Sequence, residues 1–137
     1  MQCCFYELEK PMKIDHLDHL VLTVNNIENT IAFYTNVLGM DALTFGEGRK
    51  ALKFGSQKIN LHEYGKEIEP KAGHAVMGSA DLCFITTVPL IEVVNHLRFH
   101  NVTLISEPVQ RTGAVGAILS VYFRDPDMNL IEVANQL

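Results

Sequence analysis

Apolar and polar residues alternate near the start of the chain, over residues 17–24, LDHLVLTV. A period of two and a high content of apolar and β-branched residues predict a strand. The alternation assigns the side chains to two faces: His19, Val21 and Thr23 on one, and Leu20, Leu22 and Val24 on the other. One face of this strand therefore presents polar groups, and the other is expected to be buried.

The pattern then changes to helical spacing. Asn25, with Glu28 three residues later, suits a capping box, and Gly39 suits a left-handed end, so a helix is predicted between them. Three short strands separated by turns that contain glycine are predicted next, at 40–46, 49–54 and 57–64. The first half is therefore predicted to be β-α-β-β-β.

The same order of elements returns after a polar segment, 66–79, which is the best candidate for a linker. A strand at 80–87 precedes a helix that starts near Pro89 and ends at Asn101. Three more strands are predicted at 102–110, 117–125 and 129–135. Strands with only two helices indicate an α+β fold with curled sheets. We expect one domain, 13–137, of modules 15–65 and 79–135, after an N-terminal tail, 1–12.

Matching LDHLVLTV to SADLCFIT, and KINLHE to NLIEVA, aligns the two halves. His19 then corresponds to Asp81, and Asn60 corresponds to Glu132. Glu132 stands among Leu130, Ile131 and Val133, and an unpaired carboxylate is costly to bury. If a pseudo-twofold brings these positions to one cavity, then His19, Asp81 and Glu132 suit a divalent cation. The alternative is that each polar side chain only faces solvent.

Two further residues are candidates for contacts with a substrate. His62 lies two residues beyond Asn60, so it points to the same side of the strand. Arg111 lies in QRTGAVGA, 110–117, which is either a mobile hairpin loop or an arm that presents a guanidinium to a substrate carboxylate. The glycines of this segment precede a strand and lack a Walker ending, so a phosphate loop is not indicated.

Composition narrows the class of protein. Hydrophobic residues make up 47% and the formal net charge is -5, so a nucleic-acid partner is not expected. No apolar run approaches a membrane span, and the start lacks the features of a signal peptide, which favours a cytoplasmic protein. Cys3, Cys4 and Cys83 have neither disulfide nor zinc spacing, and we expect free thiols.

The chain resembles the vicinal oxygen chelate superfamily, which includes glyoxalase I, bleomycin and fosfomycin resistance proteins and extradiol dioxygenases. The resemblance is carried by LDHLVLTVNNIENTIAFYTNVLGM, INLHE and RDPDMNLIEV, and it extends over residues 15–135. It is strongest to small bacterial glyoxalase-like proteins, some of which are labelled virulence proteins. The resemblance implies paired βαβββ modules, a cup-like sheet, a divalent metal and a dimer whose sites combine modules from two subunits.

Carried over by position, His19 matches the first-strand histidine of this superfamily and Glu132 matches its terminal glutamate ligand. Asp81 stands where the second module usually has histidine, and Asn60 stands where glyoxalase I has a glutamate. The turn DPDMN, 125–129, is expected to direct the last strand into the cavity. Met128 occupies the place of a glycine in relatives, which predicts that the backbone there needs no glycine-like conformation.

The leading functional prediction is a metal-dependent lyase or isomerase of glyoxalase I type, acting in detoxification on a small carbonyl or thiohemiacetal substrate. Ni, Zn, Mn or Fe(II) would polarise adjacent substrate oxygens and stabilise an enediolate, with Glu132 moving the proton and glutathione as a potential co-substrate. The predicted ligands are His19, Asp81 and Glu132, and the predicted substrate contacts are Asn60, His62 and Arg111. The alternatives are an extradiol dioxygenase and a non-catalytic binder of small molecules. A homodimer is expected, with no membrane partner.

Overall fold

The computed structural model describes residues 10–137. The first module contains these elements in order: β1 (His19–Val24), α2 (Ile27–Asn36), β2 (Asp41–Phe45), β3 (Arg49–Phe54) and β4 (Gln57–Glu63). The second module repeats them: β5 (Asp81–Ile85), α3 (Leu90–Phe99), β6 (Val109–Gly113), β7 (Gly116–Arg124) and β8 (Leu130–Gln136). The predicted α+β class and the β-α-β-β-β repeat are both confirmed.

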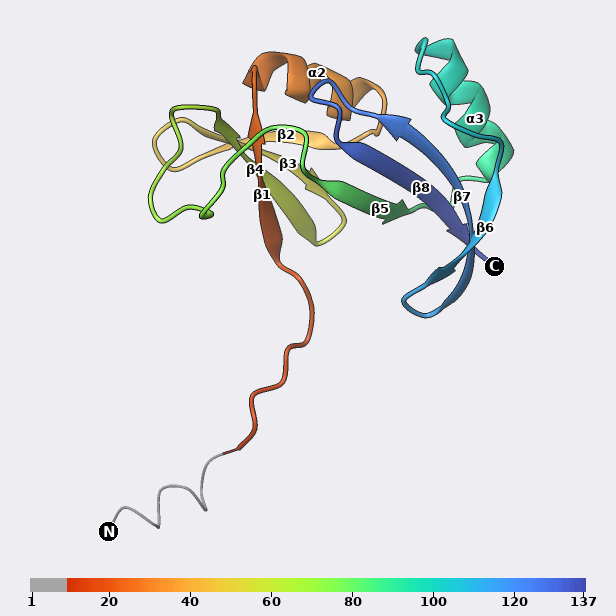
Figure 1. Ribbon diagram of the computed structural model, residues 1–137, viewed down its shortest axis with the longest axis horizontal. Coiled ribbons are helices and arrows are strands. Elements are labelled where there is room, and N and C mark those ends of the chain that lie inside the picture. Colours follow the sequence, from red (N-terminus) through yellow and green to blue (C-terminus); the bar gives the residue numbers. More distant parts are fainter. Residues whose placement is uncertain (1–9) are drawn as a thin grey trace.

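Each module forms its own open sheet of four strands (Figure 1), with the orders β1-β4-β3-β2 and β5-β8-β7-β6. The first and fourth strands pair in parallel, which places Val21 beside Asn60 and Cys83 beside Glu132. His19 and Asp81 each lie two residues before these pairs. The register therefore confirms the alignment that made His19 equivalent to Asp81 and Asn60 equivalent to Glu132.

Three predictions about where the helices, strands and loops lie are wrong. The N-cap of α2 is Asn26, not Asn25, because the Asn26 side chain accepts a hydrogen bond from the Asn29 amide at 2.9 Å. Residues 102–108 are not a strand, although Val102 and Leu104 pack against the core. Ladder pairing starts only at Val109, after a proline. Arg111 therefore lies in strand β6 and not in a loop.

One hydrophobic core joins the two modules. The face of β1 that carries Leu22 and Val24 is buried, as the alternation predicts. α2 packs on β2, β3 and β4, and α3 packs on β7. Aromatic rings meet across the modules: Phe54 with Phe84 at 5.3 Å between ring centroids, and Phe33 with Phe123 at 6.3 Å. The opposite face of each sheet carries the predicted site residues, and it is exposed at His19 and Asp81 but buried at Asn60 and His62.

The turn between β7 and β8 ties the second module to the first. Asp125 is 4% exposed, and its carboxylate accepts a hydrogen bond from the Tyr34 hydroxyl at 2.7 Å. It also accepts from the backbone amides of Asp127 and Asn129 and from the Asn129 side chain. Asn129 in turn accepts from the Ala80 amide at 2.9 Å. The motif DPDMN thus holds together α2, the turn and the start of β5.

Met128 corrects the prediction made for this turn. Its φ is +70°, which is the left-handed conformation that glycine adopts most easily. The turn therefore does need a glycine-like backbone, and a methionine adopts it at a cost. The same conformation occurs at Gly39 and Asn101, the residues predicted to end the two helices.

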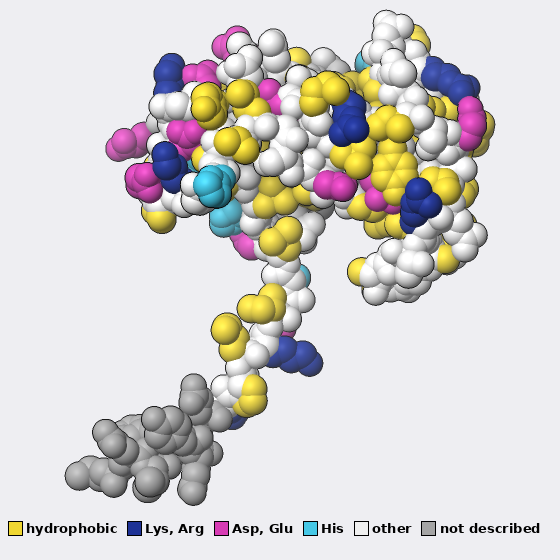
Figure 2. Space-filling model, viewed as in Figure 1, with side chains coloured by type: hydrophobic (Ala, Val, Ile, Leu, Met, Phe, Trp, Pro, Cys, Tyr) yellow, Lys and Arg dark blue, Asp and Glu magenta, His cyan; other side chains and the backbone are white. Residues whose placement is uncertain are grey.

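Residues 10–18 precede β1 and form neither helix nor strand. They extend away from the body (Figure 1), and apolar side chains are visible along them in Figure 2. Met12 is 87% exposed and Ile14 is 75% exposed. The predicted tail, 1–12, lies mostly outside the described residues. Within residues 10–137, no helix has the length and apolar content needed to cross a membrane.

Candidate functional site

Glu132 lies in the middle of β8 and is only partly buried. The Ser120 hydroxyl of β7 donates a hydrogen bond to its carboxylate at 2.5 Å. Tyr122 stands directly opposite it in the antiparallel ladder. The carboxylate that looked isolated in the sequence therefore has a partner in its own sheet, and that partner is a hydroxyl group.

Cys83 and Asp81 lie on β5, the strand next to Glu132. Burial, followed by the charges of Glu132 and Asp81, raises the pKa of the Cys83 thiol to about 11. The thiol is therefore protonated at neutral pH, and Cys83 is not an activated nucleophile. Asp81, the predicted metal ligand, is exposed at the start of the strand. Asp81 and Glu132 thus both lie close enough to Cys83 to influence it.

Arg111 reaches over the same part of the second sheet. Its Nε atom donates a hydrogen bond to the Tyr122 hydroxyl at 3.1 Å. Arg111, Tyr122, Cys83 and Glu132 line one pocket of about 480 Å³. A guanidinium and a carboxylate therefore face a common space on the open side of the second module.

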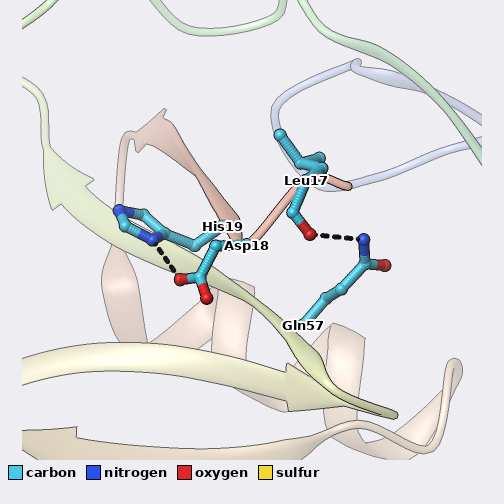
Figure 3. A network of polar contacts seen from close by, with 4 residues as sticks. All are labelled: Leu17, Asp18, His19 and Gln57. Atoms are coloured by element: carbon cyan, nitrogen blue, oxygen red, sulfur yellow. Dashed lines mark hydrogen bonds and ion pairs between the residues drawn. The ribbon is translucent and has the colours of Figure 1, made fainter. Parts of the chain in front are cut away.

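His19 lies on β1, in the other sheet. Its Nδ1 atom is 2.8 Å from the Asp18 carboxylate, and its side chain is 44% exposed (Figure 3). The hydrogen bond with His19 is the main cause that lowers the pKa of Asp18. Beside it, the Gln57 side chain donates to the Leu17 carbonyl at 2.8 Å, which fixes the start of β1 against β4. The histidine is therefore accessible and held at one edge of the first module.

Asn60 and His62 are the most buried of the predicted site residues. They are 5% and 6% exposed. Within residues 10–137, the Asn60 Oδ1 atom and both ring nitrogens of His62 are buried without a hydrogen-bond partner. Burial, followed by the charge of Arg49, lowers the pKa of His62, while Glu67 acts in the opposite direction. The imidazole is therefore neutral at neutral pH.

A single chain does not bring the predicted metal ligands together. Asp81 and Glu132 share the second sheet, whereas His19 belongs to the first. Among residues 10–137, no three His, Cys, Asp or Glu side chains lie close enough to hold a metal ion. Within the described residues, one chain therefore does not assemble the three predicted ligands. The metal site remains a prediction, and a second chain would have to complete it.

The predicted linker, 66–79, packs against the first module. Its residues Pro70, Lys71 and Ala72 join Thr23 and His62 in lining a pocket of about 360 Å³. The Glu67 side chain is 7% exposed, and Gly65 donates a backbone hydrogen bond to it at 3.0 Å. The segment thus covers the end of β4 in addition to linking the two modules.

A larger pocket, of about 540 Å³, lies between the modules. It is mostly apolar and is lined by the end of α2, by Phe54 and Phe84, and by α3 residues that include Glu92 and His96. None of the predicted site residues lines it. We therefore place the candidate chemistry on the sheet faces that carry those residues and not in this pocket.

Sequence reasoning missed Ser120 and Tyr122 as neighbours of Glu132. Both follow the alternation of β7, so they face the same side as Arg111 and Glu132. The signal was a serine and a tyrosine at alternating positions of a predicted strand. It could be used only once the pairing of that strand with the last strand was known.

Comparisons with known proteins agree with this architecture. The family model described as Glyoxalase/Bleomycin resistance protein/Dioxygenase superfamily matches residues 16–133. Virulence protein STM3117 of Salmonella typhimurium, strain LT2, is 55% identical over 123 residues, which cover 90% of this chain and 85% of that protein.

Two further relatives are of similar closeness. Glyoxalase domain-containing protein RDO1 of Mycosarcoma maydis is 52% identical over 127 residues, covering 93% of this chain and 72% of that protein. The solved structure of integron cassette protein VCH_CASS1, from the mobile metagenome of V. cholerae, has a TM-score of 0.92 at 58% identity. It covers 93% of this chain and 100% of that one.

Proposed function

Because the chain belongs to the glyoxalase/bleomycin resistance protein/dioxygenase superfamily, we propose that it is a metal-dependent lyase or isomerase of glyoxalase I type. Its substrate would be a small carbonyl compound or a thiohemiacetal formed with glutathione. The names of the relatives support this class only in general terms, since one is a glyoxalase domain-containing protein and another a virulence protein. The proposed reaction and substrate therefore depend on the geometry of the site.

The observation that carries the proposal is the pocket of the second module. Glu132 and Arg111 line it together, and Tyr122, whose hydroxyl accepts from Arg111, lies on β7 between the strands that carry them. A partly exposed carboxylate can accept and return a proton, and a guanidinium can hold an anionic group of the substrate. Cys83 is protonated there, so the thiol does not compete as a nucleophile.

The donor set fits a divalent cation only when two chains combine. Asp81 and Glu132 would come from one chain and His19 from a second, giving an imidazole and two carboxylates, which suit Ni, Zn, Mn or Fe(II). When bound, the metal would polarise adjacent oxygens of the substrate. We therefore also propose a homodimer, because His19 and Glu132 lie on separate sheets of the same chain.

Residues of the chain itself would move the proton and bind the substrate. Glu132 would carry the proton between two carbon atoms, and its hydrogen bond from Ser120 would keep the carboxylate oriented. Arg111 would bind a carboxylate of the substrate, with Tyr122 fixing the guanidinium. Asn60 and His62, from the first module, would contact the other end of the substrate.

Metal titration of the purified full chain tests the proposal. We expect a thermal shift with at least one of Ni, Zn, Mn or Fe(II), and turnover of methylglyoxal with glutathione in the presence of that metal. Asp81→Ala should weaken metal binding, whereas Asp41→Ala, an exposed aspartate in β2, should leave it unchanged. Absence of any metal response would rule out the enzyme proposal.

Mixing two inactive variants tests whether the site is shared. His19→Ala and Glu132→Gln should each abolish turnover. In a dimer that contains one chain of each variant, one site would carry both substitutions and the other site would be intact. After equal mixing about half of the dimers are of this kind, so about a quarter of all sites should regain activity. No recovery, with exchange of chains verified by mass, would show that each chain supplies all its ligands.

A non-catalytic binder of small molecules is the second candidate. One observation favours it, because Ser120 already satisfies Glu132 without a metal. This candidate expects ligand binding without metal dependence and no turnover. Uptake of oxygen with catechols under Fe(II) would instead indicate the third predicted activity, an extradiol dioxygenase.

A further inference from the structure

Residues 10–18, which we call the N-terminal arm, precede β1 and leave the body of the chain (Figure 1). Within the part of the chain that the structure describes, the hydrogen bonds that hold the arm to the body start only at Leu17, whose carbonyl accepts from a side chain of the turn before β4. Met12 and Ile14, further out, are almost fully exposed (Figure 2). A group of exposed apolar side chains is typical of a surface that a partner covers.

Exposed apolar side chains also lie beside the predicted metal ligands of both modules. On the first module, Leu17 is exposed and lies two residues before His19. On the second module, Ile85 and Val115 are exposed and line the same pocket as Glu132. Burying apolar surface on both sides is favourable, and contact of these two surfaces between copies would bury both at once.

We propose that the arm of one copy packs on the second module of another copy, over the pocket of about 480 Å³ that Glu132 and Arg111 line. This inference rests on the proposed function, which brings His19 of one chain to Glu132 of a second chain. Because the arm ends one residue before His19, it then starts at the pocket of the second chain. An extended chain rises about 3.3 Å per residue, so Ile14 lies up to about 17 Å from His19 and reaches the hairpin between β6 and β7.

The size of this contact suits a stable dimer. A twofold axis makes each copy both give an arm and receive one. The residues 10–18 and about as many residues beneath the received arm amount to roughly 20 residues a side, which is near the 20–30 of a standard interface. Each arm then covers a pocket of the other copy and excludes water from it.

Cross-linking between two differently substituted full chains tests where the arm lies. One chain carries Ile14→Cys and the other carries Val115→Cys, both with the three native cysteines replaced by serine and with tags of different mass. After the chains exchange, we expect a short bifunctional maleimide to join them into a mixed dimer. Asn29→Cys, at an exposed position of α2, replaces Val115→Cys as the control. It should give at least about tenfold less mixed product, because its effective concentration near the arm is low.

Substitutions in the arm test how much it contributes to the dimer. Met12→Ser combined with Ile14→Ser removes apolar side chains from both arms, and it should raise the dissociation constant of the dimer at least about a hundredfold, measured by sedimentation. Lys13→Ser, between these positions, is the control and should change the constant less than about threefold. Equal dissociation constants or equal cross-linking of the control would overturn the inference. A chain that is monomeric throughout would also overturn it and would indicate a different protein as the partner of the arm.

These measurements separate the arm contact from the proposed reaction, because neither of them needs metal or turnover. Recovery of turnover after mixing His19→Ala with Glu132→Gln, without a cross-link from the arm, would overturn the arm contact and keep the shared site. A cross-link from the arm in a protein that responds to no metal would support the arm contact and rule out the enzyme proposal.

Discussion

The fourth strands of the two modules carry different chemistry at equivalent positions. Glu132 is partly exposed and receives a hydrogen bond from Ser120, whereas Asn60 is 5% exposed and its Oδ1 atom has no partner within residues 10–137. Both stand beside the first strand of their sheet in the same register. The repeat therefore preserves a geometry while assigning a charge to one module and a neutral amide to the other.

The neighbouring strand explains the difference. Tyr122 stands opposite Glu132 in the antiparallel ladder, and Ser120 lies two residues before it. Ala51 stands opposite Asn60 and offers no polar group. A carboxylate is thus stabilised in the second module, where the Ser120 hydroxyl donates to it, and would be costly to bury in the first. This difference favours the second module as the source of the carboxylate in the proposed reaction.

The turns that lead into the two fourth strands also differ, and the largest effect is expected there. In the first module a short turn through Gly55 suffices, whereas Asp125 of the second module accepts hydrogen bonds from Tyr34, Asp127 and Asn129. Asp125→Ala would leave these buried donors unpaired. We expect a loss of about 4 kcal/mol in the free energy of unfolding, measured with urea.

Ser56→Ala, in the turn of the first module, is the matched control for Asp125→Ala. Ser56 is exposed, so the change should alter stability by less than about 0.5 kcal/mol. Equal effects of the two substitutions would show that the turns do not differ in the way the hydrogen bonds indicate.

Asn60→Asp tests whether the first module can accept the charge of the second. A carboxylate there would be buried opposite Ala51 without a donor, and we expect a loss of about 2–4 kcal/mol at neutral pH. Burial raises the pKa of such a carboxyl above its unfolded value, so the lost stability should return as the pH falls and the group is protonated.

Adding a hydroxyl partner sharpens this test. Ala51→Ser, combined with Asn60→Asp, should recover part of the loss, because a serine would imitate the role of Ser120 beside Glu132. Thermal unfolding of the two single variants and the double variant measures the coupling. Strict additivity would show that the neighbouring strand does not decide which module carries the carboxylate.

The sequence predicts the two modules, the faces of their strands and the pairs of equivalent residues, because these depend on local periodicity and on the internal repeat. It does not predict that Ser120 satisfies Glu132, since this contact depends on the register between β7 and β8. The strand predicted at 102–110 fails for a related reason. Its first residues are apolar enough, and the Ile105 amide donates a hydrogen bond to the Tyr122 carbonyl of β7, but regular ladder pairing starts only at Val109.

Substitution of Met128 is expected to change stability less, and the comparison is again between the two turns. Gly55 has φ +53° in the first turn and Met128 has φ +70° in the second. A left-handed conformation costs a non-glycine residue about 1 kcal/mol or more. Met128→Gly should therefore stabilise the protein by up to about 1 kcal/mol, less the greater entropy of the unfolded chain. Gly55→Ala should destabilise it, and chemical denaturation of both variants tests the sign.

The smallest effect concerns the pH dependence of stability, which should separate the neutral first module from the charged second one. Burial and the charge of Arg49 lower the pKa of His62 below its ordinary value of 6.5, with Glu67 opposing them. The unfolded state therefore binds the proton more readily, and stability should fall as the pH is lowered from about 7 toward 5. His62→Gln should flatten this slope, whereas His74→Gln, at an exposed position, should leave it unchanged. Urea unfolding across this range measures the difference. An unchanged slope in His62→Gln would mean that His62 is equally easy to protonate in both states, and the contrast between the modules would then rest on Asn60 and Glu132 alone.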